Sequence, residues 1–214
     1  MNFIHQQTEK SLCWYNHFAP LYDPLLRIIE TSIFVYWRKL LWNKVEGKNI
    51  LEVGVGTGLN FPFYPAGTSI TAVDNSESML SKAREKARKQ NLKVDLKLMN
   101  IQRMDFQDNS FDTVVSAMVF CAFNEPQEGL REVKRVVRSG GKIVMLEHCN
   151  SDKKWLASLI NLINPLVAGL TGENFNRDTV YNVKASGLIV ENVIRLSSIF
   201  RLIEARKERI FMLK

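Results

Sequence analysis

Cysteine and long apolar runs are scarce in this chain of 214 residues, and each scarcity excludes a class of protein. The three cysteines, Cys13, Cys121 and Cys149, show neither metal-ligand spacing nor a Cys-x-x-Cys motif, so we predict reduced thiols and no metal site. Cys149 adjoins His148, but neighbouring residues on a strand point to opposite faces, which favours a buried structural thiol over a nucleophile.

The N-terminus lacks a basic leader followed by an apolar signal core, so we expect a cytoplasmic protein. The most apolar segment, residues 155–170, holds Asn161, Asn164 and Pro165 and is shorter than the roughly 20 apolar residues of a membrane-spanning helix. We predict instead a broken helix pair that forms a wall of an acceptor pocket above the carboxyl ends of the strands.

Low-complexity segments and internal repeats are absent as well, and a content of 46% hydrophobic and 24% charged residues is typical of a globular protein. The length suits one α/β domain with a substantial core. The net charge of +7 includes a dense run of Lys and Arg over residues 82–97. Its helical spacing with Leu80, Ala83 and Ala87 favours a solvated helix face, and we expect no nucleic-acid partner.

The first feature present along the chain is an apolar N-terminal region, which we assign to a helical cap over residues 1–47. Cations such as Arg38 and Lys39 lie among its Trp, Leu and Ile residues. This composition fits a cap packed on a core with snorkelling cations, and it also fits a helix that contacts an anionic membrane surface. We favour the cap, with peripheral membrane contact as the alternative. The sequence does not determine the oligomeric state.

Residues 48–214 alternate between strand and helix patterns, which predicts one α/β domain with a parallel sheet covered on both faces. Two final runs, 188–193 and 199–205, are joined by a short connection and predict an antiparallel pair. The other predicted strands are 49–53, 69–73, 94–98, 111–116 and 141–147, and the predicted helices are 58–63, 76–90 and 125–137.

The most specific motif is Glu52-Val53-Gly54-Val55-Gly56-Thr57-Gly58, a strand that ends in a glycine-rich turn and opens a helix. Glycines at alternate positions allow a sharp reversal and a close approach of a ligand to the main chain. Asp74 ends the next apolar run about twenty residues later, the spacing at which a carboxylate meets ribose hydroxyls.

A dinucleotide-binding turn is the main rival interpretation, but its third glycine belongs where this chain has Leu59. Glu52 also brings a carboxylate to the strand end, which suits a cationic ligand better than a pyrophosphate. S-adenosylmethionine carries a sulfonium and an ammonium group and no phosphate. The motif therefore predicts this molecule rather than NAD as the cofactor.

Four ordered motifs resemble those of class I S-adenosylmethionine-dependent methyltransferases: residues 50–58, 73–80, 108–115 and 138–142. The resemblance implies a Rossmann-like seven-stranded sheet with its last strand antiparallel, S-adenosyl-L-methionine as the cofactor and S-adenosyl-L-homocysteine as the product. Residues 15–23 resemble the N-terminal signature of quinone-biosynthesis C-methyltransferases and phospholipid N-methyltransferases. Residues 146–148, Trp155 and residues 176–179 resemble thiol S-methyltransferases as well.

The resemblance also implies a set of cofactor contacts. The glycines would line the methionine part, Asp74 would take the ribose hydroxyls, and Asn75 and Met79 would flank the adenine, whose amino group would face Asn100. The implied cofactor-binding residues are Glu52, Gly54, Gly56, Gly58, Asp74, Asn75, Met79, Asn100, Ile101 and Ser116.

Methyl transfer from a sulfonium is an in-line displacement that depends mainly on positioning, and a base helps only when the nucleophile is protonated. His148, at the end of the fifth strand, is the predicted base, and Tyr15 and Tyr22 are candidates for closing the pocket. A structural role is the alternative for all three.

We expect the acceptor to be a hydrophobic small molecule or lipid, such as a phospholipid amine, a quinone precursor or a thiol. Two alternatives stay open: a non-enzymatic cofactor-binding or membrane-surface protein, and an RNA or protein methyltransferase. The Asp/Asn-Pro-Pro-Tyr-like tetrapeptide usual for amino-group methylation of nucleic acid or protein is absent after the fourth strand, where the chain has residues 116–119.

Overall fold

A seven-stranded mixed sheet forms the centre of the computed structural model, which describes residues 12–13, 16–17, 32–123, 125–171 and 174–209. The strand order is β3-β2-β1-β4-β5-β7-β6, with the first five strands parallel and β7 antiparallel to both of its neighbours. The strands are β1 (Asn49–Val53), β2 (Ser69–Asp74), β3 (Asp95–Leu98), β4 (Phe111–Ala117), β5 (Val137–His148), β6 (Ile189–Arg195) and β7 (Phe200–Arg206).

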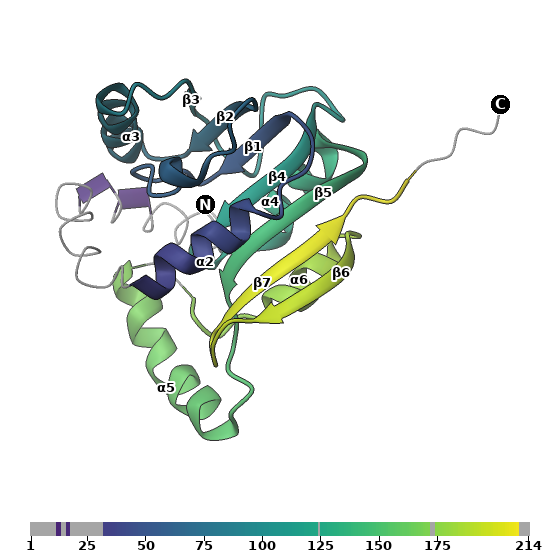
Figure 1. Cartoon of the computed structure of the whole chain (residues 1–214). Helices are drawn as coiled ribbons and strands as arrows, with labels where there is room; N and C mark the ends of the chain where they lie inside the picture. The colour runs from purple at the N-terminus through teal and green to yellow at the C-terminus, as the bar shows by residue number, and fades with distance from the viewer. Residues whose placement is uncertain (1–11, 14–15, 18–31, 124, 172–173, 210–214) are drawn as a thin grey trace.

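Helices pack on both faces of this sheet (Figure 1). On one face, α4 and α6 pack on Leu51, Val53 and Ile143. On the other face, α2 places Trp37, Leu41 and Trp42 against alternate residues of the same strands. The helices are α2 (Ser32–Trp42), α3 (Glu77–Lys89), α4 (Pro126–Val136), α5 (Lys154–Thr171) and α6 (Thr179–Ala185).

The predicted fold class and the antiparallel final pair are confirmed, and two predicted elements are wrong. The expected helix 58–63 is only a 3₁₀ turn, η1 (Phe61–Phe63), because Pro62 limits the segment to one turn. The expected helix pair at 155–170 is a single helix, α5, which continues through Pro165. β5 also begins four residues earlier than predicted, at Val137, where its first pairing with Phe111 precedes a register shift.

The basic run of α3 is confirmed as a solvated helix face. Met79, Leu80, Ala83 and Ala87 are buried, while the cations between them point outward. Cys149 is a buried free thiol, as predicted, and burial raises its pKa. The proposed division into residues 1–47 and 48–214 stays a prediction, because most residues before Ser32 lie outside the described ones.

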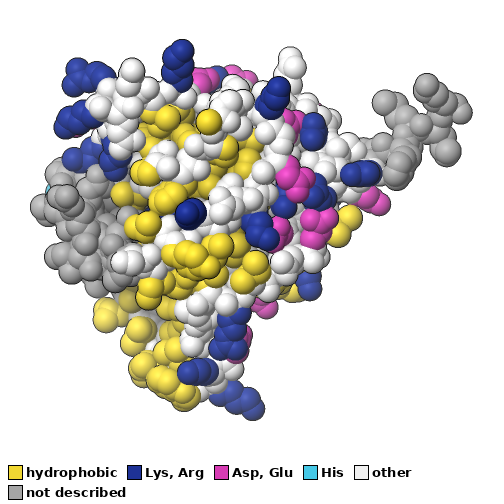
Figure 2. All heavy atoms as spheres, viewed as in Figure 1, with side chains coloured by type: hydrophobic (Ala, Val, Ile, Leu, Met, Phe, Trp, Pro, Cys, Tyr) yellow, Lys and Arg dark blue, Asp and Glu magenta, His cyan; other side chains and the backbone are white. Residues whose placement is uncertain are grey.

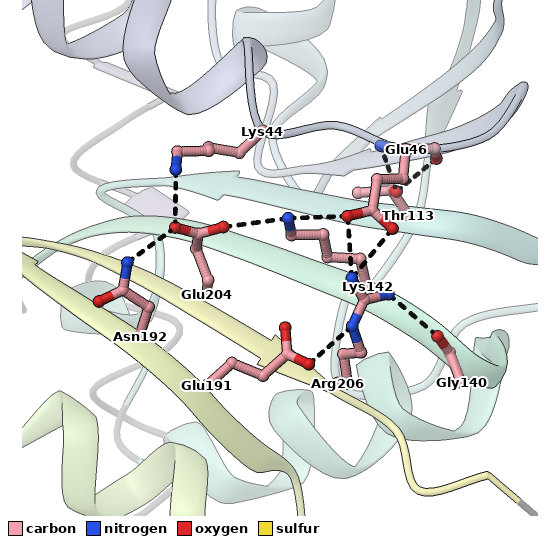
Figure 3. A network of polar contacts seen from close by, with 9 residues as sticks. All are labelled: Lys44, Glu46, Thr113, Gly140, Lys142, Glu191, Asn192, Glu204 and Arg206. Carbon is pink, nitrogen blue, oxygen red and sulfur yellow. Dashed lines mark hydrogen bonds and ion pairs between the residues drawn. The ribbon is translucent and has the colours of Figure 1, made fainter.

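Ion pairs connect the segment before β1 with the C-terminal strands (Figure 3). Lys142 of β5 bridges Glu46 and Glu204, with its Nζ 3.0 Å from an oxygen of each. Arg206 of β7 binds Glu46 at 2.8 Å, and Lys44 binds Glu204 at 3.0 Å. The hydrogen bond from Arg206 is the main reason that the pKa of Glu46 falls to about 2.

Candidate functional site

The glycine-rich turn after β1 forms the floor of the site. The amides of Gly54 and Val55 both donate to the carbonyl of Val73, at 2.8 and 3.0 Å, which ties the turn to the end of β2. Gly54 and Gly56 have φ angles of +68° and +54°, in the left-handed region that favours glycine. A Cβ on Gly56 would point into open space, whereas one on Gly54 would collide with Val119. Open space beside Gly56 leaves room for a ligand against the backbone.

Asp74 lies at the end of β2 and faces this turn. One carboxylate oxygen accepts the Gly56 amide at 2.8 Å, and the other accepts the Ser76 amide at 2.9 Å. Burial raises the pKa of this carboxyl group. Each carboxylate oxygen accepts more than one hydrogen bond, so the group retains acceptor capacity toward a ligand that carries hydroxyls.

A cavity opens above these residues with about 820 Å³ of empty space, part of it open to solvent. The polar part of its lining consists of Arg38, Thr57, Asn60, Asp74, Asn75 and Ser76. The apolar part includes Leu12, Val55, Leu59, Met79, Ile101, Ala117, Met118, Val119, Ala122 and Phe123.

A chain of buried polar groups links α2 to the glycine turn. Arg38 is only 4% exposed, and its Nη1 donates to Asn60 Oδ1 at 2.9 Å. Asn60 Nδ2 in turn donates to Glu52, which also accepts a hydrogen bond from the Tyr64 hydroxyl. Because Arg38 and Asn60 line the cavity, this chain brings a cation and an amide to the ligand space.

Glu52 has a different place from the one expected. Its side chain is fully buried behind Asn60 and does not line the cavity. Burial raises its pKa to about 7, so the carboxyl group is partly protonated at neutral pH. Glu52 therefore does not present its carboxylate directly to the ligand space, as the sequence suggested, but accepts a hydrogen bond from Asn60, which lines the cavity.

Glu147 of β5 shapes the opposite wall of the cavity. This fully buried carboxyl accepts hydrogen bonds from the Ser116 hydroxyl at 2.9 Å and from the amides of Val119 and Phe120. Just before them, Met118 has a φ of +58°, unusual for a residue other than glycine. Glu147 thus holds the turn that presents Met118 and Val119 to the cavity.

The segment after β3 closes the side of the cavity near α3. Asn75 Oδ1 accepts the Ile101 amide at 3.2 Å, which joins two lining residues. Ser76 caps α3 by accepting the Met79 amide at 3.2 Å, and its hydroxyl donates to Asn16 at 2.6 Å. Asn16 thus contacts a lining residue, and Leu12 lines the cavity itself.

Six of the ten predicted cofactor contacts lie together in the lining: Gly54, Gly56, Asp74, Asn75, Met79 and Ile101. The other four do not. Gly58 is needed for packing, because a Cβ there would meet the Phe61 ring. Asn100 turns its Oδ1 to the Gln102 amide, and Ser116 and Glu52 are buried behind the surface.

His148 is not among the cavity-lining residues. Its ring lies against Phe175 and Phe200, with centroid distances of 4.9 and 4.1 Å. Within the described part of the chain, its Nδ1 is buried and has no hydrogen-bond partner. Burial lowers its pKa to about 4, so the ring is neutral at pH 7. The other two candidates, Tyr15 and Tyr22, lie outside the described residues.

Arg38, Asn60 and Glu147 are the residues that sequence reasoning missed as parts of the site. Arg38 was grouped with the surface cations of an amphipathic helix, and no spacing rule connects it with the glycine turn. Among the described residues, no group of three or more His, Cys, Asp or Glu side chains is arranged to hold a metal ion.

Comparison with known proteins gives a consistent result. Residues 51–145 match the family model described as a methyltransferase domain. The phosphatidylethanolamine N-methyltransferase of Cereibacter sphaeroides is 40% identical over 53% of this chain and 57% of its own length. A thiol S-methyltransferase of Mus musculus is 37% identical over 46% of this chain and 42% of its own length. The match thus spans about half the length of these two relatives.

A longer and weaker match is the demethylmenaquinone methyltransferase of Bacteroides fragilis, which is 27% identical over 84% of this chain and 80% of its own length. Among solved structures, a possible histamine N-methyltransferase of Thermotoga maritima superposes with a TM-score of 0.69 at 16% identity. That superposition covers 92% of this chain and all of the other, and it concerns the fold alone.

Proposed function

We propose that the chain is a class I S-adenosylmethionine-dependent methyltransferase and that it moves a methyl group to a hydrophobic small molecule or lipid. The methyl donor of that class is S-adenosylmethionine. The proposal rests on one observation: the Asp74 carboxylate and the open space beside Gly56 lie in the same cavity.

The residues of the cavity suit the parts of this cofactor. Asp74 would accept hydrogen bonds from the ribose hydroxyls, because it keeps acceptor capacity after binding two amides. Met79 and Ile101 offer apolar surface for the adenine ring. Arg38 would pair with the carboxylate of the amino-acid end, since its guanidinium lines the cavity and binds carboxylates through charge-assisted hydrogen bonds.

The bound cofactor would supply an electrophilic methyl group. The chain then has to hold the acceptor in line with it and exclude water. Met118, Val119 and Phe123 give the cavity an apolar side, which suits a hydrophobic acceptor better than a charged one. His148, neutral at pH 7, would accept a proton only from an acceptor that reaches its ring, which lies outside the cavity lining.

A phospholipid amine, a quinone precursor and a thiol are the acceptors we propose, because the three relatives are named for transfer to such groups. The chemistry of the lining does not rank them. An RNA or protein methyltransferase, and a protein that binds the cofactor without catalysis, are the competing functions.

Replacement of Asp74 tests the cofactor assignment. Asp74→Asn should weaken binding of S-adenosylhomocysteine by about 10- to 100-fold, because the site loses charged acceptors worth roughly 1.5–3 kcal/mol each. Isothermal titration calorimetry gives the affinity, and thermal unfolding checks that the variant is folded. Asp95→Asn, an exposed carboxylate of β3, is the matched control. Equal affinity in Asp74→Asn and wild type would remove the ribose assignment.

Transfer of a labelled methyl group to a panel of phospholipids, quinols, thiols, RNA and peptides tests the reaction. We expect incorporation into one of the first three classes. Incorporation into RNA or peptide alone would contradict the proposed acceptor, and no incorporation alongside intact cofactor binding would favour a non-enzymatic protein.

A further inference from the structure

Helix α5 exposes an apolar face to solvent. Trp155, Leu159, Leu162, Ile163 and Leu166 have exposed fractions of 66%, 47%, 78%, 46% and 69%. At 3.6 residues per turn these five positions fall within an arc of about 100° of the helix. They form one continuous stripe, which we call the α5 stripe.

The opposite side of α5 faces the protein and is partly polar. Ile160, Asn164 and Ala168 are buried there. Asn164 Oδ1 accepts the Phe175 amide at 2.8 Å, and Asn164 Nδ2 donates to Asn174. A surface helix normally buries its apolar stripe and exposes its polar one. Helix α5 departs from this rule, because the side-chain amide of Asn164 points toward the protein and the large apolar side chains of the α5 stripe point into solvent.

The charged residues within 153–171 are all basic. Residues 153–171 contain no Asp or Glu, and Lys153 and Lys154 stand at the start of the helix. The nearest carboxylate in the sequence, Asp152, is bound by Arg195 at 3.0 Å and by Arg201 at 2.7 Å. Figure 2 shows the hydrophobic side chains gathered at the lower end of the molecule, where α5 lies, with Lys and Arg beside them.

We propose that the α5 stripe docks on a lipid surface with anionic headgroups. Trp, Leu and Ile side chains would enter the boundary between headgroups and acyl chains, and Lys153 and Lys154 would meet the lipid phosphates. A second copy of the chain fits less well, because residues 153–171 of that copy would offer no carboxylate to pair with Lys153 and Lys154. Within the described residues no helix is long and apolar enough to cross the bilayer, so the contact is interfacial.

The inference rests on the exposed stripe and its charges, and it does not depend on methyl transfer. It also differs from the sequence expectation, which favoured a cap for the N-terminal region with membrane contact there as the alternative, and which made residues 155–170 a pocket wall. In α2, the cation Arg38 that suggested membrane contact is buried at the cavity.

Vesicle co-sedimentation tests the docking surface. The full chain should bind phosphatidylcholine vesicles that contain phosphatidylglycerol, bind pure phosphatidylcholine more weakly, and lose affinity at high salt. The triple variant Trp155→Ser, Leu162→Ser, Leu166→Ser should lose at least about tenfold in partitioning, because three apolar side chains no longer enter the lipid. Leu98→Ser, which truncates a side chain that is 54% exposed on β3, is the matched control.

Trp155 supplies a direct readout. Its fluorescence, taken as the difference between wild type and Trp155→Phe, should shift to shorter wavelength on addition of vesicles and be quenched by brominated lipid. Three results would overturn the proposal: no binding by the wild type, equal binding by the triple variant, or a wild-type dimer in sedimentation that the triple variant abolishes. Cofactor titration of the triple variant should give the wild-type affinity. A loss of vesicle binding with unchanged cofactor binding then concerns the docking surface alone and leaves the proposed function untouched.

Discussion

Arg38 illustrates how a single residue takes its role from its surroundings. Its sequence neighbours are Trp37, Lys39 and other residues of an amphipathic helix. In the structure it is buried beside Asn60 and faces the cavity. Because its guanidinium lines the cavity, a carboxylate on a bound ligand could form a charge-assisted hydrogen bond with it, as proposed above.

Arg38→Met should therefore weaken S-adenosylhomocysteine binding by about tenfold or more, through loss of a charged contact worth roughly 1.5–3 kcal/mol. Binding of 5′-methylthioadenosine, which lacks the amino-acid end, should change little. Calorimetric titration of both ligands into both proteins gives the comparison. A loss of equal size for the two ligands would mean that Arg38 acts only through the shape of the pocket.

The raised pKa of Glu52 predicts that the free energy of unfolding falls as the pH rises. Its pKa in the folded state is raised from 4.5 to about 7, so its contribution to stability is fully present below pH 4.5 and is lost as the pH rises through 7. The loss amounts to about 3 kcal/mol at most, from about 1.4 kcal/mol per pKa unit.

Urea unfolding at about pH 5 and about pH 8 measures this loss. Glu52→Gln should show a smaller fall in unfolding free energy between the two pH values than wild type, because it has no proton to release. Glu85→Gln, on the exposed face of α3, should keep the wild-type difference. The assignment fails if Glu52→Gln has the same pH dependence as wild type.

At the scale of elements, two glycines of the turn between β1 and η1 have different surroundings: one is packed against a side chain, and the other borders the ligand space. Gly54 packs against Val119 and adopts a positive φ, whereas Gly56 has the positive φ with open space beside it. The same residue type thus serves core packing at one position and access for a ligand two residues later.

Alanine at these positions should have different effects. Gly54→Ala should lower the unfolding free energy by about 3 kcal/mol or more, from backbone strain and a clash with Val119. Gly56→Ala should cost only the strain, about 1–2 kcal/mol, yet reduce cofactor affinity, because its methyl group occupies ligand space. Gly67→Ala shares the positive φ and the open surroundings and should leave binding unchanged. Unaltered cofactor binding by Gly56→Ala would contradict the proposed position of the ligand.

At the scale of the whole molecule, the ion pairs of Figure 3 join parts of the chain that lie far apart in sequence. Glu46 and Arg206 are 160 residues apart, and Lys142 connects both Glu46 and Glu204. The side chains of Lys142 and Glu204 are each 8% exposed. The C-terminal strand pair is thereby fastened to the beginning of the sheet.

Lys142→Met should lower the unfolding free energy by about 2–4 kcal/mol, because it leaves the Glu204 carboxylate buried with fewer partners. The double variant Lys142→Met, Glu204→Met should be more stable than Lys142→Met alone, since no buried charge is then stranded. Chemical unfolding of the single and double variants provides the measurement. If the losses of unfolding free energy from Lys142→Met and Glu204→Met simply add in the double variant, Lys142 and Glu204 do not stabilise each other.

The sequence determined the features that depend on local order along the chain. The alternation of strands and helices, the final antiparallel pair, the glycine turn and the spacing to Asp74 follow from neighbouring residues, since hydrophobic period and backbone freedom are local properties. The elements and their order were accordingly predicted well, apart from η1, the single helix α5 and helix α6, which no predicted element covered. The specific acceptor stays a proposal, because its binding depends on side chains around the cavity.

Only the tertiary structure decided which distant side chains meet. Arg38 reaches Asn60 across 22 residues, and Glu147 reaches Val119 across 28. Glu52 and Ser116 are predicted cofactor contacts but lie behind the cavity surface. The outward orientation of the α5 stripe was equally hidden, because a helix has the same amphipathic pattern whichever side faces the protein. Packing makes that choice, by burying Asn164 and leaving Leu162 in solvent.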